Sequence, residues 1–188
     1  MKKALFILLA ISTFYGCSTL PENFSYRYTG ENTGLGQLID INGYYISPFG
    51  CDSSFHSVYM FYANGLFTIA TTSEIPNEVI DCFREGGDSK LCKYPVWGIY
   101  ELEGNLIRTQ TLRTEGSGFV IFRDYRILPD ESIVNISDYV ELQYTNLAYI
   151  SNYPSFTENP CKKKAVFYPL ETKRDSTECP ILKRLMKK

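Results

Sequence analysis

The sequence has very little of the side chains on which most catalytic and metal centres depend. It contains one histidine, His56, and no two cysteines are separated by two residues. Zinc sites need closely spaced cysteine or histidine ligands, and a serine or cysteine triad needs a histidine base. His56 stands alone beside a predicted strand. The sequence therefore predicts no catalytic residue, no metal site and a protein that is not an enzyme.

Motifs for nucleotides and for hydrolysis are also incomplete. The segment "GLGQLI" lacks the third glycine of a dinucleotide-binding loop, and "EGSGF" does not match the G-x-S-x-G elbow of hydrolases. Glu101 and Glu103 share one face of a predicted strand, but they lie next to the Gly104-Asn105 turn, which favours a solvent-exposed rim. We therefore expect no cofactor.

Charges of both signs are scattered along the chain, and no long basic run is present. The 188 residues include 19 Lys and Arg against 21 Asp and Glu, which gives a net charge of −2. Removal of Lys2 and Lys3 with the first residues would make it −4. A balance of this kind predicts no nucleic-acid partner, and it gives no electrostatic reason to expect an anionic membrane surface.

The beginning of the chain has the features of an export signal. Two lysines precede the apolar run "ALFILLAI", and the more polar "STFYG" follows, ending at Gly16 before Cys17. The apolar run is shorter than the about 20 residues that a membrane-spanning helix needs, so we expect it to be removed.

This segment resembles a bacterial lipoprotein signal, in which a small residue precedes a cysteine that receives lipid and becomes the first residue. Phe14 stands where such signals usually carry leucine. The resemblance implies lipidation at Cys17, a membrane partner through this anchor, and a place in the bacterial cell envelope, at the outer membrane facing the periplasm. An ordinary secretory signal followed by a coincidental cysteine is the alternative.

Short strands separated by turn residues dominate the remainder of the chain. Fifteen Tyr and twelve Phe favour strands over helices, and Asn64-Gly65, Gly104-Asn105 and Pro129-Asp130 are turn signals. The predicted strand segments are residues 41–47, 57–72, 97–112, 118–136, 139–145 and 164–170. We expect about eight strands in an all-β antiparallel up-and-down barrel or a sandwich.

The order "NGYY", "YMFYANGLF", "WGIYELEGNLIRTQ" and "YRILPDESIV" resembles the lipocalin-like bacterial lipoproteins, whose fold is an eight-stranded up-and-down barrel. Tyr45 occupies the position of the tryptophan in the lipocalin G-x-W signature. The resemblance covers residues 38–188. It implies a barrel domain at residues 38–188. The export-like beginning predicts a signal peptide at residues 1–16, and the polar segment between the two, which contains several glycines and shows no sustained period, predicts a flexible tether at residues 17–37.

Five cysteines follow Cys17, and in an exported protein they meet an oxidising environment. Their spacing suggests two disulfides, Cys82 with Cys92 and Cys161 with Cys179, although the sequence alone does not fix the connectivity. Cys51 is then left over.

Binding is the function class that remains. An eight-stranded barrel is either filled by its own side chains or holds one small ligand. We expect a site at the barrel mouth beneath the long connection from Ser73 to Val96, which would act as a lid. Its candidate residues are Trp97, Tyr100, Arg108, Arg123 and Tyr125. Arg123 shares a face with Phe119, Ile121, Tyr125 and Ile127, but alternation in this strand does not say which face points inward.

Two function classes are therefore open. One is a lipid-anchored carrier or sensor of a small amphipathic molecule. The other is a solid barrel whose loops contact or inhibit an envelope protein or another envelope macromolecule.

Overall fold

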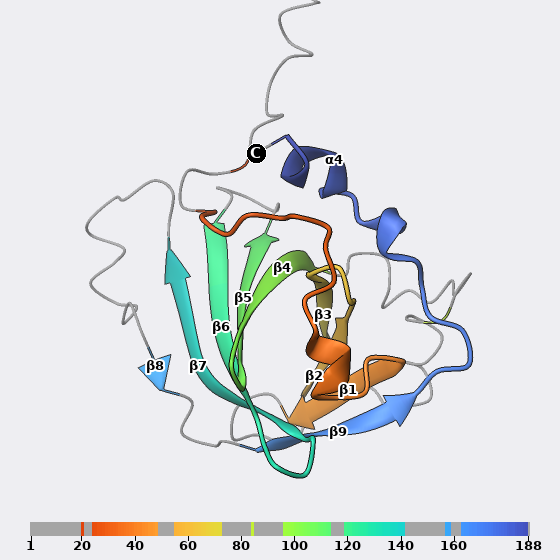
Figure 1. Ribbon diagram of the computed structural model, residues 1–188. Coiled ribbons are helices and arrows are strands. Elements are labelled where there is room, and N and C mark those ends of the chain that lie inside the picture. The colour runs from red at the N-terminus through yellow and green to blue at the C-terminus, as the bar shows by residue number, and fades with distance from the viewer. Residues whose placement is uncertain are drawn as a thin grey trace, which may run out of the picture.

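The computed structural model describes residues 20, 24–48, 55–72, 84, 96–113, 119–141, 157–158 and 163–187 (Figure 1). These residues form nine strands, two short 3-10 helices and one short α-helix. The strands are β1 (Gly43–Pro48), β2 (His56–Phe61), β3 (Leu66–Thr72), β4 (Val96–Glu103), β5 (Leu106–Arg113), β6 (Phe119–Ile127), β7 (Ile133–Glu141), β8 (Thr157–Glu158) and β9 (Lys164–Pro169). The helices are η1 (Leu35–Gln37), η3 (Ser176–Glu178) and α4 (Leu182–Leu185).

The strands form a closed barrel. From β1 to β7 each strand pairs antiparallel with the next one in the sequence, and β9 pairs with both β7 and β1. The ring therefore contains eight strands, while β8 pairs with β7 outside it. The expected fold class, an antiparallel up-and-down barrel of about eight strands, is confirmed. The architecture is compatible with a lipocalin-like fold.

Strand β7 corrects one detail of the expected strand pattern. Residues 133–136 and 139–145 looked like separate strands, but residues 133–141 are continuous. In the register with β6, Tyr125 lies opposite Asn135 and Asp124 opposite Ser137, so Ile136 is an extra residue. An extra residue is a β-bulge, which locally interrupts the alternation of side chains. This interruption made one strand resemble two.

The three turn signals of the sequence connect neighbouring strands. Gly65 has a φ of 86° and its N–H donates to the carbonyl of Tyr62 at 3.2 Å, while Gly104 has a φ of 59°. At the Pro129-Asp130 turn the position with positive φ is taken by Glu131, at 61°. All three turns join strands at the same end of the barrel, whereas the longer connections leave from the other end.

The barrel interior is packed with aromatic rings. Tyr59 of β2 and Tyr125 of β6 have ring centroids 5.0 Å apart, although their strands are not neighbours, so these rings meet across the barrel. We call the buried residues on this side the interior cluster. It consists of Leu35, Ile39, Tyr45, Tyr59, Phe61, Phe67, Ile69, Tyr100, Ile107, Tyr125, Ile127, Ile133 and Ala165.

The outer face of the barrel is also buried over much of its area. The outer cluster combines strand residues with residues from both ends of the described chain: Phe24, Tyr44, Ile46, Val58, Met60, Tyr62, Leu66, Trp97, Ile99, Leu112, Val120, Phe122, Cys179, Ile181 and Leu185. Figure 1 shows the N-terminal segment and α4 close to each other at one side of the barrel. Because both faces of several strands are covered, hydrophobic alternation does not identify the inner face.

The expected tether at residues 17–37 is wrong for residues 24–37. The N-terminal strap, residues 24–33, packs against the barrel, with Phe24 fully buried in the outer cluster. Within this strap, the backbone N–H of Tyr26 donates to Oε1 of Gln110 at 2.9 Å. Next to the strap, η1 inserts Leu35 into the interior cluster and closes the end of the barrel that carries the tight turns. Isolated apolar residues in a polar segment carry these contacts, which is why composition suggested a tether.

Candidate functional site

The half of the interior toward the longer connections contains buried hydroxyl groups. Ser47 and Ser57 lie opposite each other on β1 and β2, and each is 4% exposed. Thr109 and Thr111 follow on the inner face of β5, and both are buried. Along each strand, these residues alternate with residues that face outward. They therefore lie on the same inner face as the interior cluster. The interior therefore changes from aromatic packing at the η1 end to a more polar lining at the other end.

These hydroxyl groups are held by local hydrogen bonds. The hydroxyl groups of Ser47 and Tyr59 are 2.8 Å apart. Thr109 Oγ1 donates to the carbonyl of Arg123 at 3.0 Å, and Thr111 Oγ1 donates to the carbonyl of Ile121 at 3.3 Å. A hydroxyl that donates its proton still has lone pairs that accept hydrogen bonds. These buried hydroxyl groups therefore keep acceptor capacity on the inner face.

Arg123 brings a cation to the inner face of this half. It is directly opposite Thr109 in the register of β5 and β6, and two residues before Tyr125. Since directly opposed residues in an antiparallel pair share a face, Arg123 lies on the inner side. Its side chain is half-buried, and the backbone of Asp138 lies opposite it on β7.

Tyr100 and Tyr125 lie together in the interior cluster, with Phe61 between them. The ring centroid of Phe61 lies 5.6 Å from that of Tyr100 and 6.2 Å from that of Tyr125. The Tyr100 hydroxyl donates to the carbonyl of Tyr62 at 2.6 Å and is 2.7 Å from Thr33 Oγ1. Burial raises the pKa of Tyr100 to about 12. Both tyrosines thus lie on the inner face, as does Arg123.

Trp97 and Arg108, the two other candidate residues, are on the outer face. The Trp97 ring stacks on Tyr62 with centroids 5.6 Å apart and belongs to the outer cluster. Arg108 is 46% exposed and pairs with Glu103 at 3.2 Å. The structure therefore brings three of the five candidate residues to one face and separates these two from them.

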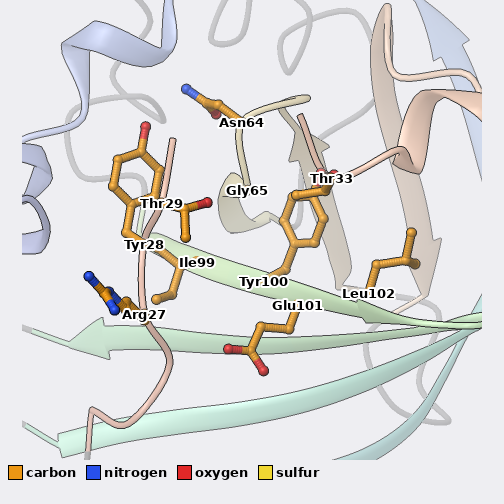
Figure 2. Close-up of a pocket in the computed structure, with 10 residues that line it drawn as sticks. All are labelled: Arg27, Tyr28, Thr29, Thr33, Asn64, Gly65, Ile99, Tyr100, Glu101 and Leu102. Atoms are coloured by element: carbon orange, nitrogen blue, oxygen red, sulfur yellow. Dashed lines mark hydrogen bonds between the residues drawn. The ribbon is translucent and has the colours of Figure 1, made fainter. Parts of the chain in front are cut away.

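A hollow lies outside the barrel, between the strap, the Asn64-Gly65 turn and β4 (Figure 2). Its volume is about 360 Å³. Figure 2 shows Thr33 and Tyr100 together on one side and Tyr28 with Thr29 on the other. The sequence does not indicate this hollow, because the polar composition of residues 24–33 predicts a tether where the strap lies. Its lining residues are Arg27, Tyr28, Thr29, Thr33, Asn64, Gly65, Ile99, Tyr100, Glu101 and Leu102.

Another hollow, of about 350 Å³, lies near the turn between β6 and β7. Asp130 in this turn pairs with Lys164 of β9 at 2.5 Å, and also accepts a hydrogen bond from Ser132. The bonds from Lys164 and Ser132 lower the pKa of Asp130 to about 2. Within the described part of the chain, no group of three His, Cys, Asp or Glu side chains is placed to hold a metal ion.

The described part of the chain contains one cysteine, Cys179. It is buried in the outer cluster with a free thiol, so the expected disulfide between Cys161 and Cys179 is not formed in this structure. Burial raises the pKa of the Cys179 thiol to about 11. Cys17, Cys51, Cys82, Cys92 and Cys161 lie outside the described residues. The same is true of the connection from Ser73 to Val96, except for Arg84 and Val96 themselves.

No family model, no curated protein and no solved structure matches the chain. Among the described residues, no helix is long and apolar enough to span a membrane.

Proposed function

We propose that this protein is a lipid-anchored barrel of the bacterial cell envelope that binds a small amphipathic ligand in the polar half of its interior. The supporting observation is the unequal lining of the barrel. One end is closed by η1 and aromatic rings, whereas the other half carries buried hydroxyl groups and Arg123. A ligand with an apolar body and a polar or anionic head would match this lining.

The anchor in this proposal is a lipid on Cys17, after removal of residues 1–16, with the barrel facing the periplasm. Gly16 before Cys17 and the short apolar run support it. Cells grown with a clickable fatty acid should label the wild-type protein but not a Cys17→Ala variant. Equal labelling of both proteins would reject the anchor.

Ligand binding can be tested on protein purified from its own envelope. Native mass spectrometry should find a retained small molecule, and Arg123→Gln should reduce the retained fraction because it removes the cation from the inner face. Arg108→Gln is the matched control, since Arg108 lies on the outer face. The same reduction in both variants, or an empty wild-type barrel, would contradict the proposed site.

A second function is supported by the contact between Tyr59 and Tyr125. These rings meet across the barrel, and such contacts between opposite walls are expected of a solid barrel. In this case the protein binds an envelope macromolecule through its loops and acts as an interaction protein or inhibitor. The same native mass spectrum would then contain a protein partner in place of a small molecule.

One further part of the proposal concerns the two cysteines of the long connection. A disulfide between Cys82 and Cys92 stays a prediction, and peptide mapping without reduction should recover it. A pairing of Cys51 with either residue would contradict it. From the sequence we also expect that neither mode of binding involves a chemical reaction, a cofactor or a nucleic acid.

A further inference from the structure

The C-terminal helix α4 exposes a small surface that combines basic and apolar side chains. Ile181 and Leu185 are buried in the outer cluster and fix the helix to the barrel. Lys183, Met186 and Lys187 are exposed, and Met186 is 71% exposed. Residues three and four positions apart share one face of a helix. These three side chains therefore form one surface, which we call the basic face.

The helical hydrogen bonds support this geometry beyond the four residues of α4. The N–H of Met186 donates to the carbonyl of Leu182 at 3.0 Å, and the N–H of Lys187 donates to that of Arg184 at 3.3 Å. The turn thus continues through the residues that form the basic face. Met186 is the most exposed large hydrophobic side chain in the described part of the chain. Val166, at 56%, lies on a strand instead, two residues after a lysine that is paired with Asp130.

The position of the basic face relative to Cys17 suggests what contacts it. Leu20 packs against the same outer cluster as Ile181 and Leu185. It is three residues from Cys17, and three extended residues span at most about 11 Å. A lipid on Cys17 would therefore hold Leu20, and the outer cluster beneath it, close to the membrane surface.

We propose that the basic face rests on an anionic phospholipid surface and orients the barrel beside its anchor. This inference depends on the proposed lipidation of Cys17. Basic side chains near an anionic bilayer contribute about a five-fold increase in partitioning for each lysine. Met186 inserts between the headgroups while the two lysines contact phosphate groups. The net charge of −2 does not reveal this arrangement, because it is a sum over the whole chain, whereas Lys183 and Lys187 lie on one turn.

Met186 itself provides the measurement, because an exposed methionine reacts with peroxide to form the sulfoxide. Mature protein purified from its own envelope is placed in vesicles of phosphatidylcholine alone or with one quarter phosphatidylglycerol. Peptide mass spectrometry then follows oxidation of Met186, with the fully buried Met60 as an unreactive reference. We expect oxidation of Met186 to be several-fold slower in the anionic vesicles.

Two charge-reversal variants separate a local effect from a general one. Lys183→Glu with Lys187→Glu should abolish the protection of Met186. Arg126→Glu with Lys163→Glu changes the net charge equally at exposed positions outside α4, and should keep the protection. Equal oxidation rates in both kinds of vesicle, or equal loss of protection in both variants, would overturn the inference.

Flotation of the vesicles in high salt distinguishes a missing contact of the basic face from a missing lipid anchor. A lipid-anchored protein floats with vesicles of either composition, so flotation without protection of Met186 rejects only the basic face. If no protein floats in high salt, the anchor is rejected. The basic face is then judged alone by binding to the anionic vesicles in low salt, where absence of binding rejects it as well.

Discussion

Tyr59 and Tyr125 meet inside the barrel from strands that are not neighbours, with their ring centroids 5.0 Å apart and their planes at 67°. This contact joins β2 to β6 across the interior. Tyr125 is fully buried, and it also contacts Phe61. The pair therefore links opposite walls of the barrel, which hydrogen bonds between adjacent strands do not do.

Removal of one ring from this pair should destabilise the barrel strongly. Tyr125→Ala leaves a cavity that the surrounding strands cannot fill, and we expect a loss of about 3–5 kcal/mol in the free energy of unfolding. Urea denaturation measures this loss. Val166→Ala, at a position that is 56% exposed, should change stability by less than about 0.5 kcal/mol. Similar losses in both variants would contradict the interior position of Tyr125.

Close approach of strands at Gly98 gives a second prediction. A Cβ at this position would lie 2.2 Å from the carbonyl oxygen of Gln110 and 2.6 Å from the Phe67 ring. We expect Gly98→Ala to cost about 3 kcal/mol, or to prevent folding, because backbone must move. Gly104→Ala meets no atom within 4 Å, and only its φ of 59° is unfavourable, which costs about 1–2 kcal/mol. Thermal unfolding should show the larger loss for Gly98→Ala.

The barrel could be predicted from the sequence because its strands and turns depend on local chemistry. Asn64-Gly65 and Gly104-Asn105 are turn sequences whichever way the strands face. The inward direction of Arg123 could not be predicted in this way. The strap and the C-terminal segment bury the outer face of the barrel, so this face carries apolar side chains as well. The strand therefore has no polar side that would identify the solvent-facing residues in the sequence.

The candidate site was predictable only in part for a related reason. Tyr100, Arg123 and Tyr125 share the inner face, but Trp97 is on the outer face because it stacks on Tyr62, a contact between residues far apart in sequence. The exposed hollow beside the strap involves segments separated by up to about 75 positions, from Arg27 to Leu102. A sequence pattern carries no information about such contacts until the barrel is assembled.

Attachment of the strap can be tested at Gln110, which is fully buried. Its Oε1 accepts from the Tyr26 N–H at 2.9 Å, and its Nε2 donates to the Ser25 hydroxyl at 2.7 Å. Gln110→Leu leaves these groups without their partner, at a cost of about 1–3 kcal/mol. Hydrogen exchange at the Tyr26 amide should therefore accelerate. The exposed Gln37→Leu is the control, and equal exchange in both variants would contradict the proposed attachment.

The pH dependence of stability should report on Lys173, which connects the C-terminal segment to the barrel. Its Nζ donates to the carbonyls of Ile41 and Phe61 and lies 4.3 Å from the centroid of the Tyr62 ring. Burial lowers the pKa of Lys173 to about 8 from an ordinary value of 10.5. Between these two values the unfolded chain binds a proton that the folded protein has lost. Stability should therefore rise with pH in this range.

The useful window is from about pH 8 to 9, because Cys179 and the tyrosines limit it at the upper end. Burial raises the pKa of Cys179 to about 11 from an ordinary value of 9.0, and it also raises the pKa values of Tyr45 and Tyr62. At about pH 9 and above, the unfolded chain therefore loses these protons first and stability falls. Urea denaturation at several pH values should show the rise for the wild type and a flatter profile for Lys173→Met. The comparison uses the slopes, since the substitution also removes two hydrogen bonds and lowers stability at every pH. Parallel profiles for the two proteins would mean that Lys173 keeps its ordinary pKa, and that its ammonium group is solvated in the folded barrel.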